Sequence, residues 1–225
     1  MGWKGIIAFA ALSCVCVVSV RAAEPVRAET KEGWKLDFKT PGVAVYSRPR
    51  PRSTFREFKG VGTFNVPPAV VNAVLQDREN YPKFVPHMAE CRVLKRDGDT
   101  VFVYQRLDVP IFSDRDYIQR VRERTRLGPN GQVYEMTWRP ANDAGPPPPK
   151  GVVRLKDFEG SWVLEPEGAG STRMTFYLFT DTGSIPRYFA NRGTRGAIMK
   201  TFSAIRKRLT DPKYRGATGP GRTGG

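Results

Sequence analysis

The sequence predicts an α+β protein in which a curved antiparallel β-sheet wraps around a long C-terminal α-helix. Two hairpin turns, at residues 97–98 (DG) and 128–131 (GPNG), join segments rich in β-formers, and tight turns of this kind imply antiparallel pairing. One face of such a sheet must be covered. Only the helical pattern at residues 186–209 is long enough to cover it, so we expect the sheet to curve around this helix.

The chain has 225 residues, of which 40% are hydrophobic and 26% charged, a balance that favours a single globular domain. Residues 1–22 have a basic start, an apolar middle and a small-residue end, which predicts a secretory signal peptide cleaved before Ala23. A retained membrane anchor is the alternative, although the apolar stretch is short of the roughly 20 residues that a span needs. We therefore expect an exported protein, in the periplasm or cell envelope, with a flexible lead-in at residues 23–33.

The formal net charge is +15, and a charge of this size implies an acidic partner. Export argues against nucleic acid, and the chain has no compact basic and aromatic pattern for reading bases. The predicted partner is an anionic membrane surface. Signal cleavage would leave Cys91 as the single cysteine, so the domain would rely on its core rather than on a disulfide, and we interpret Cys91 as a small buried hydrophobe.

Alternating β-formers predict strands at residues 43–47 and 55–65. Pro67 and Pro68 then open a short helix whose apolar stripe is formed by Val70, Val71, Val74 and Leu75. Aromatic residues and prolines at 77–87 predict a turn with a brief helix. Further strands are expected at residues 91–95, 101–109, 116–127, 132–139, 152–158, 161–165 and 172–180, with a proline-stiffened loop at 142–150.

The long helix should begin at Pro186, because a residue before proline, here Ile185, avoids helical geometry. Its apolar stripe repeats at spacings of 4, 3 and 4 and consists of Ile198, Phe202, Ile205 and Leu209. The remaining residues, 210–225, are rich in glycine and basic, so we expect a disordered tail.

Side chains alternate between the two faces of a strand. In residues 115–124 the face that carries Asp116, Ile118, Arg120, Arg122 and Arg124 should be wet, so Arg115, Tyr117, Gln119 and Val121 should point inward. The strands that follow add large apolar groups to the same inner face. Such a face is either a packed core or the wall of a ligand site, which is typically apolar with a few polar anchors.

Three stretches of the chain are similar to the START family, the lipid-transfer domains related to steroidogenic acute regulatory protein, within the helix-grip superfamily. Residues 66–92 (VPPAVVNAVLQDRENYPKFVPHMAECR) resemble its early helix and following loop. Residues 109–121 (VPIFSDRDYIQRV) resemble the strand that begins with Arg-Asp-aromatic, and residues 160–162 with 183–191 (GSIPRYFAN) resemble the last strands and the lead-in to the closing helix. The resemblance covers residues 34–209 and implies an exported bacterial-type member with a helix-grip fold and a lipid-sized internal cavity.

The resemblance further implies non-catalytic binding and transfer of a single hydrophobic lipid, such as a sterol or phospholipid, by a monomer without a cofactor. The predicted ligand contacts are Tyr104, Arg115, Tyr117, Gln119, Met136, Trp138, Leu155, Trp162, Met174, Phe176, Leu178, Ile198 and Phe202. Many family cavities keep a buried arginine, sometimes paired with an acid on the preceding strand, where this chain has Gln105 and Arg106. Arg115 therefore either pairs with Asp108 or Asp116, which we favour, or meets a polar group of the lipid.

Gly193 and Gly196 each cost the long helix about 1 kcal/mol relative to alanine. Either they pack closely against a bulky strand residue, or they weaken the first turns so that these and residues 182–186 open as a gate. The predicted membrane-docking residues around this gate are Arg187, Arg192 and Arg195, which would meet anionic headgroups.

The alternative function is a cyclase- or hydrolase-like enzyme of the same superfamily acting on a hydrophobic substrate. General acid–base catalysis favours a histidine or a perturbed carboxylate in the pocket. His87 is the only histidine, and its proline-flanked loop favours a surface or structural role. Because one histidine and one remaining cysteine do not suit a zinc site, we predict no metal and no catalytic residue.

Overall fold

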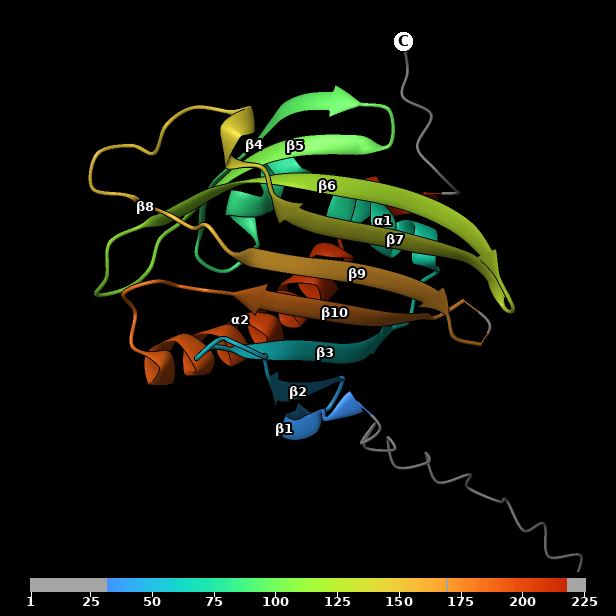
Figure 1. The fold of residues 1–225 in the computed structure, drawn as a ribbon. Helices are drawn as coiled ribbons and strands as arrows, with labels where there is room; N and C mark the ends of the chain where they lie inside the picture. Colours follow the sequence, from blue (N-terminus) through green and yellow to red (C-terminus); the bar gives the residue numbers. More distant parts are fainter. Residues whose placement is uncertain (1–31, 169, 218–225) are drawn as a thin grey trace, which may run out of the picture.

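The computed structural model describes residues 32–168 and 170–217, so the predicted signal peptide and most of the lead-in lie outside the described residues. One curved sheet runs in the order β1-β2-β3-β10-β9-β7-β6-β5-β4, antiparallel except where the short β8 pairs with β6. Helices α1 (Pro68–Gln76) and α2 (Arg187–Arg208) lie on the same face of this sheet (Figure 1). The predicted α+β class, with a long C-terminal helix gripped by the sheet, is confirmed. The strands are β1 (Lys35–Thr40), β2 (Val43–Pro49), β3 (Arg56–Phe64), β4 (Met88–Asp97), β5 (Thr100–Leu107), β6 (Arg115–Gly128), β7 (Gly131–Pro140), β8 (Val153–Arg154), β9 (Phe158–Pro166) and β10 (Thr172–Thr180).

Both predicted hairpins form, between β4 and β5 and between β6 and β7. Gly98 and Gly131 occupy their turns with φ values of 57° and 121°, which glycine adopts without strain. Strand β1 was not predicted, because its sequence KLDFKT lacks a clear alternation, and pairing with β2 holds it in the sheet. The strand predicted at residues 152–158 was too long, since only Val153–Arg154 pairs with β6 before the chain crosses to β9.

Helix α2 rests directly on β3 because that strand presents two glycines to it. A Cβ atom on Gly60 would lie 2.6 Å from Cγ2 of Ile198, and one on Gly62 would lie 2.8 Å from Cε1 of Phe202. The ring of Phe202 stacks on Phe64 with 5.8 Å between the ring centroids. Glycine at both positions thus lets the helix approach closely where any larger residue would hold it away.

Two expectations about exposure are wrong. Asp116 and Ile118 on the outer face of β6 are fully buried, because residues 141–155 fold over them. Arg154 binds the Asp116 carboxylate through two hydrogen bonds of 2.8 and 2.9 Å, which compensates the buried charge. Arg120, Arg122 and Arg124, farther along the same face, are exposed as expected.

The prediction that a disordered tail starts at residue 210 is wrong for residues 210–217. Residues 210–217 are described and contain a short 3-10 turn, Pro212–Tyr214, that returns to the end of α1. The ring of Tyr214 is only 4% exposed and its hydroxyl donates to Asp77, while Nζ of Lys213 lies 2.6 Å from the same carboxylate. This segment therefore belongs to the folded domain, and residues 218–225 lie outside the described residues.

Candidate functional site

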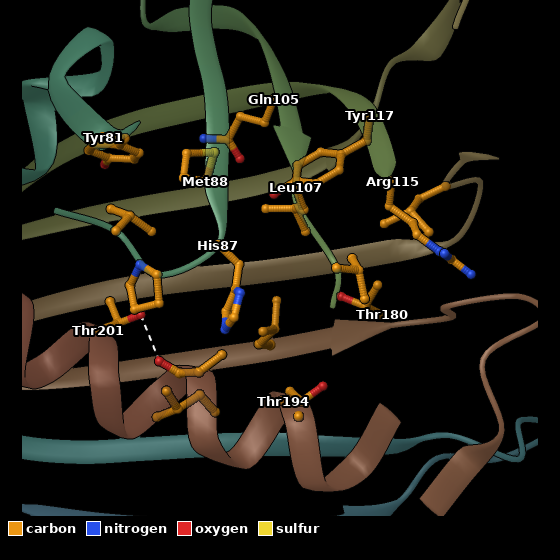
Figure 2. Close-up of a pocket in the computed structure, with 18 of the residues that line it drawn as sticks. Tyr81, His87, Met88, Gln105, Leu107, Arg115, Tyr117, Thr180, Thr194 and Thr201 are labelled. Atoms are coloured by element: carbon orange, nitrogen blue, oxygen red, sulfur yellow. Dashed lines mark hydrogen bonds between the residues drawn. The ribbon is translucent and has the colours of Figure 1, made fainter. Parts of the chain in front are cut away.

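A cavity of about 530 Å³ lies between α2 and the concave face of the sheet. Its walls come from α2, from β5, β6, β7, β9 and β10, and from the segments that precede β4 and β6. Figure 2 shows Gln105, Leu107 and Tyr117 on the sheet side of this space, with Thr194 and Thr201 of α2 across from them. The walls are mainly apolar, and the volume falls within the range of roughly 300–1,000 Å³ that is typical of pockets for one small molecule.

Strand alternation places most of the predicted contact residues on this wall. They are Arg115, Tyr117, Gln119, Met136, Trp138, Leu155, Trp162, Phe176, Leu178 and Ile198. Trp162 stacks on Phe176 at 3.8 Å, and Trp138 lies 5.8 Å from Trp162. The indole of Trp138 has room because position 160 is glycine, where a Cβ would lie 2.2 Å from its Cζ2.

Tyr104, Met174 and Phe202 were also predicted to contact the ligand, and none of them lines the cavity. Tyr104 points to the opposite face of β5 from Gln105, and the guanidinium of Arg92 lies 4.9 Å above its ring. Met174 and Phe202 face inward but are completely buried in the core, where α2 meets the sheet. For these two residues the packed-core interpretation was the right one.

Several wall residues were not singled out from the sequence. On α2 they are Phe189, Ala190, Thr194, Ala197 and Thr201. The last three lie about one turn or less from Ile198, so extending its apolar stripe to neighbouring small residues would have found them. Both threonine hydroxyls donate to helix carbonyls, from Thr194 to Ala190 at 2.9 Å and from Thr201 to Ala197 at 2.8 Å. They consequently present little free polarity to the cavity. The β5–β6 loop and residues 81–88 carry no periodic signal that could have placed them there.

Two buried arginines line the cavity: Arg78, which is 3% exposed and pairs with Glu123, and Arg115, which is 2% exposed. Arg115 is the one without a carboxylate partner among the described residues. Its Nη1 donates to the Ser113 carbonyl, its Nη2 to Oγ of Ser184 at 3.3 Å, and its Nε has no hydrogen-bond partner among the described residues. The favoured pairing with Asp108 or Asp116 is wrong, since Asp116 binds Arg154 instead. Burial without a carboxylate partner lowers the pKa of Arg115.

Two buried tyrosines of the wall are poorly suited to take a proton. Burial raises the pKa of both Tyr81 and Tyr117 far above the ordinary value, so both stay neutral. His87 lies at the exposed rim, with its ring directed toward the cavity in Figure 2. Within residues 32–168 and 170–217 there is no group of three or more His, Cys, Asp or Glu side chains that could hold a metal.

One end of the cavity carries exposed hydrophobic side chains. Ile111 in the β5–β6 loop is 89% exposed and has a φ of 63°, a rare backbone conformation for a β-branched residue. At the start of α2, Tyr188 is 67% exposed and Phe189 50%, and the ring of Phe189 lies 6.3 Å from that of Phe112. None of the helices in the described part of the chain is long and apolar enough to cross a membrane.

The same end of α2 carries the predicted docking arginines. Arg187 and Arg192 are exposed, whereas Arg195 is half-buried with Nη1 3.9 Å from Oδ2 of Asp37. Close packing does not explain the two helix glycines, because a Cβ on Gly193 or Gly196 would meet no atom within 4 Å.

Comparison with known proteins gives consistent results. A family model described as polyketide cyclase/dehydrase and lipid transport matches residues 64–191. An uncharacterised protein of Pseudomonas aeruginosa is 29% identical over 177 residues, covering 78% of this chain and 86% of that protein. The phosphatidylcholine transfer protein of Mus musculus is 23% identical over 175 residues, covering 75% and 80%.

Among solved structures, the STAR-related lipid transfer protein of Xanthomonas axonopodis matches with a TM-score of 0.71 and 26% identity, covering 80% of this chain and 99% of that one. Human StAR-related lipid transfer protein 5 matches with a TM-score of 0.70 and 16% identity over 81% and 88% of the two chains, a likeness of fold.

Proposed function

Because this chain belongs to the polyketide cyclase/dehydrase and lipid transport family, we propose that it binds one hydrophobic lipid in its internal cavity and transfers it between membranes. The observation that carries the proposal is the apolar cavity of about 530 Å³ beneath α2. A solid core of the same side chains would be more stable, since each void forfeits packing energy. A hollow lined by Trp138, Trp162 and Phe176 is therefore best explained by a hydrophobic guest. The relatives named for lipid transfer support the same function.

The lipid enters, in this proposal, through the end of the cavity formed by the β5–β6 loop and the first turns of α2. Ile111, Tyr188 and Phe189 expose apolar surface there, and side chains of this kind insert readily into the interface of a bilayer. The strained backbone at Ile111 costs about 1–3 kcal/mol, a price that functional loops often carry. Arg187 and Arg192 beside them add attraction to anionic headgroups.

A vesicle assay tests both the function and the entry site. The purified protein is expected to carry extractable lipid and to move fluorescent lipid between anionic vesicles. Replacing Arg187, Arg192 and Arg195 together by glutamine should weaken vesicle binding and slow transfer. The matched control replaces Arg120, Arg122 and Arg124 on the outer face of β6 by glutamine, which removes the same charge. Equal losses in both triple variants would contradict this entry site, and absence of any bound or transferred lipid would contradict the function.

Export is part of the same proposal, resting on the signal-like pattern of residues 1–22. Mass spectrometry of the protein from its own host should find a mature chain that begins at Ala23. A chain that keeps residues 1–22 would instead support a membrane anchor.

The alternative, a cyclase- or hydrolase-like enzyme on the same fold, needs a group that can take or give a proton near neutral pH. Burial raises the pKa values of Tyr81 and Tyr117, so both stay protonated at neutral pH and cannot accept a proton, which leaves His87 at the rim and Asp108. The extracted lipid should therefore be chemically unchanged after incubation with the protein. A product that no longer forms with His87→Ala would favour the enzyme.

A further inference from the structure

Arg115 and Thr180, the latter at the end of β10, both line the cavity (Figure 2). The guanidinium of Arg115 has five N–H donors and makes two hydrogen bonds to residues of the described chain, to the Ser113 carbonyl and to Oγ of Ser184. Both acceptors are neutral, and the 3.3 Å bond to Ser184 is long. The positive charge is consequently almost fully removed from water without a negative partner, an arrangement that proteins rarely keep.

Carboxylates are available on both sides of Arg115 in the sequence, yet both serve other arginines. Oδ2 of Asp114 lies 2.7 Å from Nη1 of Arg106. Asp116 points to the outer face of β6, where Arg154 holds it. The chain therefore satisfies the neighbouring acids and leaves the inward-facing arginine without one.

A second unsatisfied donor lies in the same wall. The hydroxyl of Thr182 is buried and, like Nε of Arg115, has no hydrogen-bond partner among the residues that the structure describes. Thr182 belongs to the segment between β10 and α2, two residues before the Ser184 that Arg115 contacts, and Thr182 and Arg115 both line the cavity. These are the two buried side-chain polar atoms that the described protein leaves unpaired, and both can donate to an oxygen.

We propose, building on the proposed function, that the cavity selects lipids with an acidic headgroup, whose negatively charged oxygens bind Arg115 and Thr182. A carboxylate or a phosphate supplies the anion, and an arginine fork matches the geometry of either group. The hydrocarbon part of the lipid then lies along the apolar wall formed by Tyr117, Met136 and Trp138. A sterol or a fatty alcohol offers only a neutral hydroxyl and would leave the buried charge uncompensated.

The test uses delipidated full-length protein and three single-chain lipids with the same C18 tail: oleic acid, oleoyl lysophosphatidic acid and oleyl alcohol. At least one of the acidic lipids should bind about tenfold or more tightly than the alcohol, the scale of one charge-assisted hydrogen bond. Whether the carboxylate or the phosphate binds more tightly distinguishes the two sources of the anion. Arg115→Met should abolish this preference, and Thr182→Val should reduce it. The charge-matched control, Arg122→Met on the outer face of β6, should keep the wild-type preference.

The proposal is overturned if the wild type binds the alcohol as tightly as both acids, or if Arg115→Met retains the preference. In either of those outcomes the lipid-binding function still stands. Failure of all three lipids to bind would instead overturn the proposed function together with this inference. Arg115→Met is expected to fold and to unfold at a higher temperature without lipid, because it replaces an unpaired buried charge by an apolar side chain. Should it fail to fold, Thr182→Val decides the question: unchanged selectivity in that variant counts against the site.

Discussion

Replacing the two glycines of α2 tests whether they lower the stability of this helix. Added Cβ atoms on Gly193 and Gly196 would meet nothing within 4 Å, so alanine fits at both positions. Each replacement should stabilise the helix by about 1 kcal/mol. In a domain of this size 1 kcal/mol corresponds to about 2–4 °C in Tm, so the double variant should unfold at a Tm higher by about 4–8 °C. Thermal unfolding of delipidated protein, followed by circular dichroism, measures the change.

The matched control is Gly60→Ala on β3, where the new Cβ would lie 2.6 Å from Ile198. Overpacking at such a contact costs about 1–3 kcal/mol, so this alanine should lower Tm while those in α2 raise it. A lower Tm for Gly196→Ala would refute the reasoning from open space.

The same variants test the proposed gate. Gly193 lines the cavity and Gly196 does not, so Gly196→Ala stiffens the helix without occupying lipid space. If the first turns of α2 must loosen to admit lipid, this variant should transfer lipid more slowly at unchanged equilibrium binding. A higher Tm combined with the wild-type transfer rate would show that α2 does not gate the cavity.

Three further predictions concern the cavity, the acid sensitivity and the C-terminal segment. Ala197→Trp should fill the cavity and reduce the lipid recovered per protein while Tm of the delipidated protein holds or rises; full lipid occupancy would contradict the assigned cavity. Burial opposes the charged form of Glu159, but hydrogen bonds from Arg50 and Tyr177 outweigh it and lower its pKa. Its contribution to stability is thus present above the unfolded-state pKa of about 4.3 and is lost as the pH falls through the lower folded pKa, so Glu159→Gln should flatten the loss of Tm between about pH 5 and 3. Tyr214→Ala should lower the free energy of unfolding by about 3 kcal/mol in urea titrations; no change would mean that residues 210–217 are not part of the domain.

Most of the fold could be predicted because its signals are local. The hairpin glycines, Pro186 and the spacing of Ile198 and Ile205 each act over a few residues. The START resemblance, which rested on residues 66–92, 109–121, 160–162 and 183–191, is confirmed. The errors arise where contacts distant in the sequence decide. Burial of Asp116 depends on Arg154, which returns to β6 from beyond the proline-rich loop, and no strand pattern reveals that return.

In the candidate site, too, local patterns were read correctly and contacts distant in the sequence were missed. Alternation on β6 correctly directed Arg115 and Tyr117 toward the cavity, because a strand has only two faces. Tyr104 was misplaced because its assignment was not tied to the register of β5 against β6, in which it lies opposite the outward-facing Ile118. Whether an inward residue meets ligand or core depends on the local distance between helix and sheet, and a strand pattern carries no information about that distance.

That distance has a physical origin in β3. Gly60 and Gly62 let α2 sit almost on the strand backbone, which leaves Phe202 between them and Phe64 with no space to spare. The sheet curves away from this line of contact, so the strands at its other end, β5 and β6, face α2 across a gap that short side chains such as Ala197 and Thr194 do not fill. Gly60 and Gly62 thus permit the close approach of α2 to β3, and the cavity lies beside this contact, toward β5 and β6.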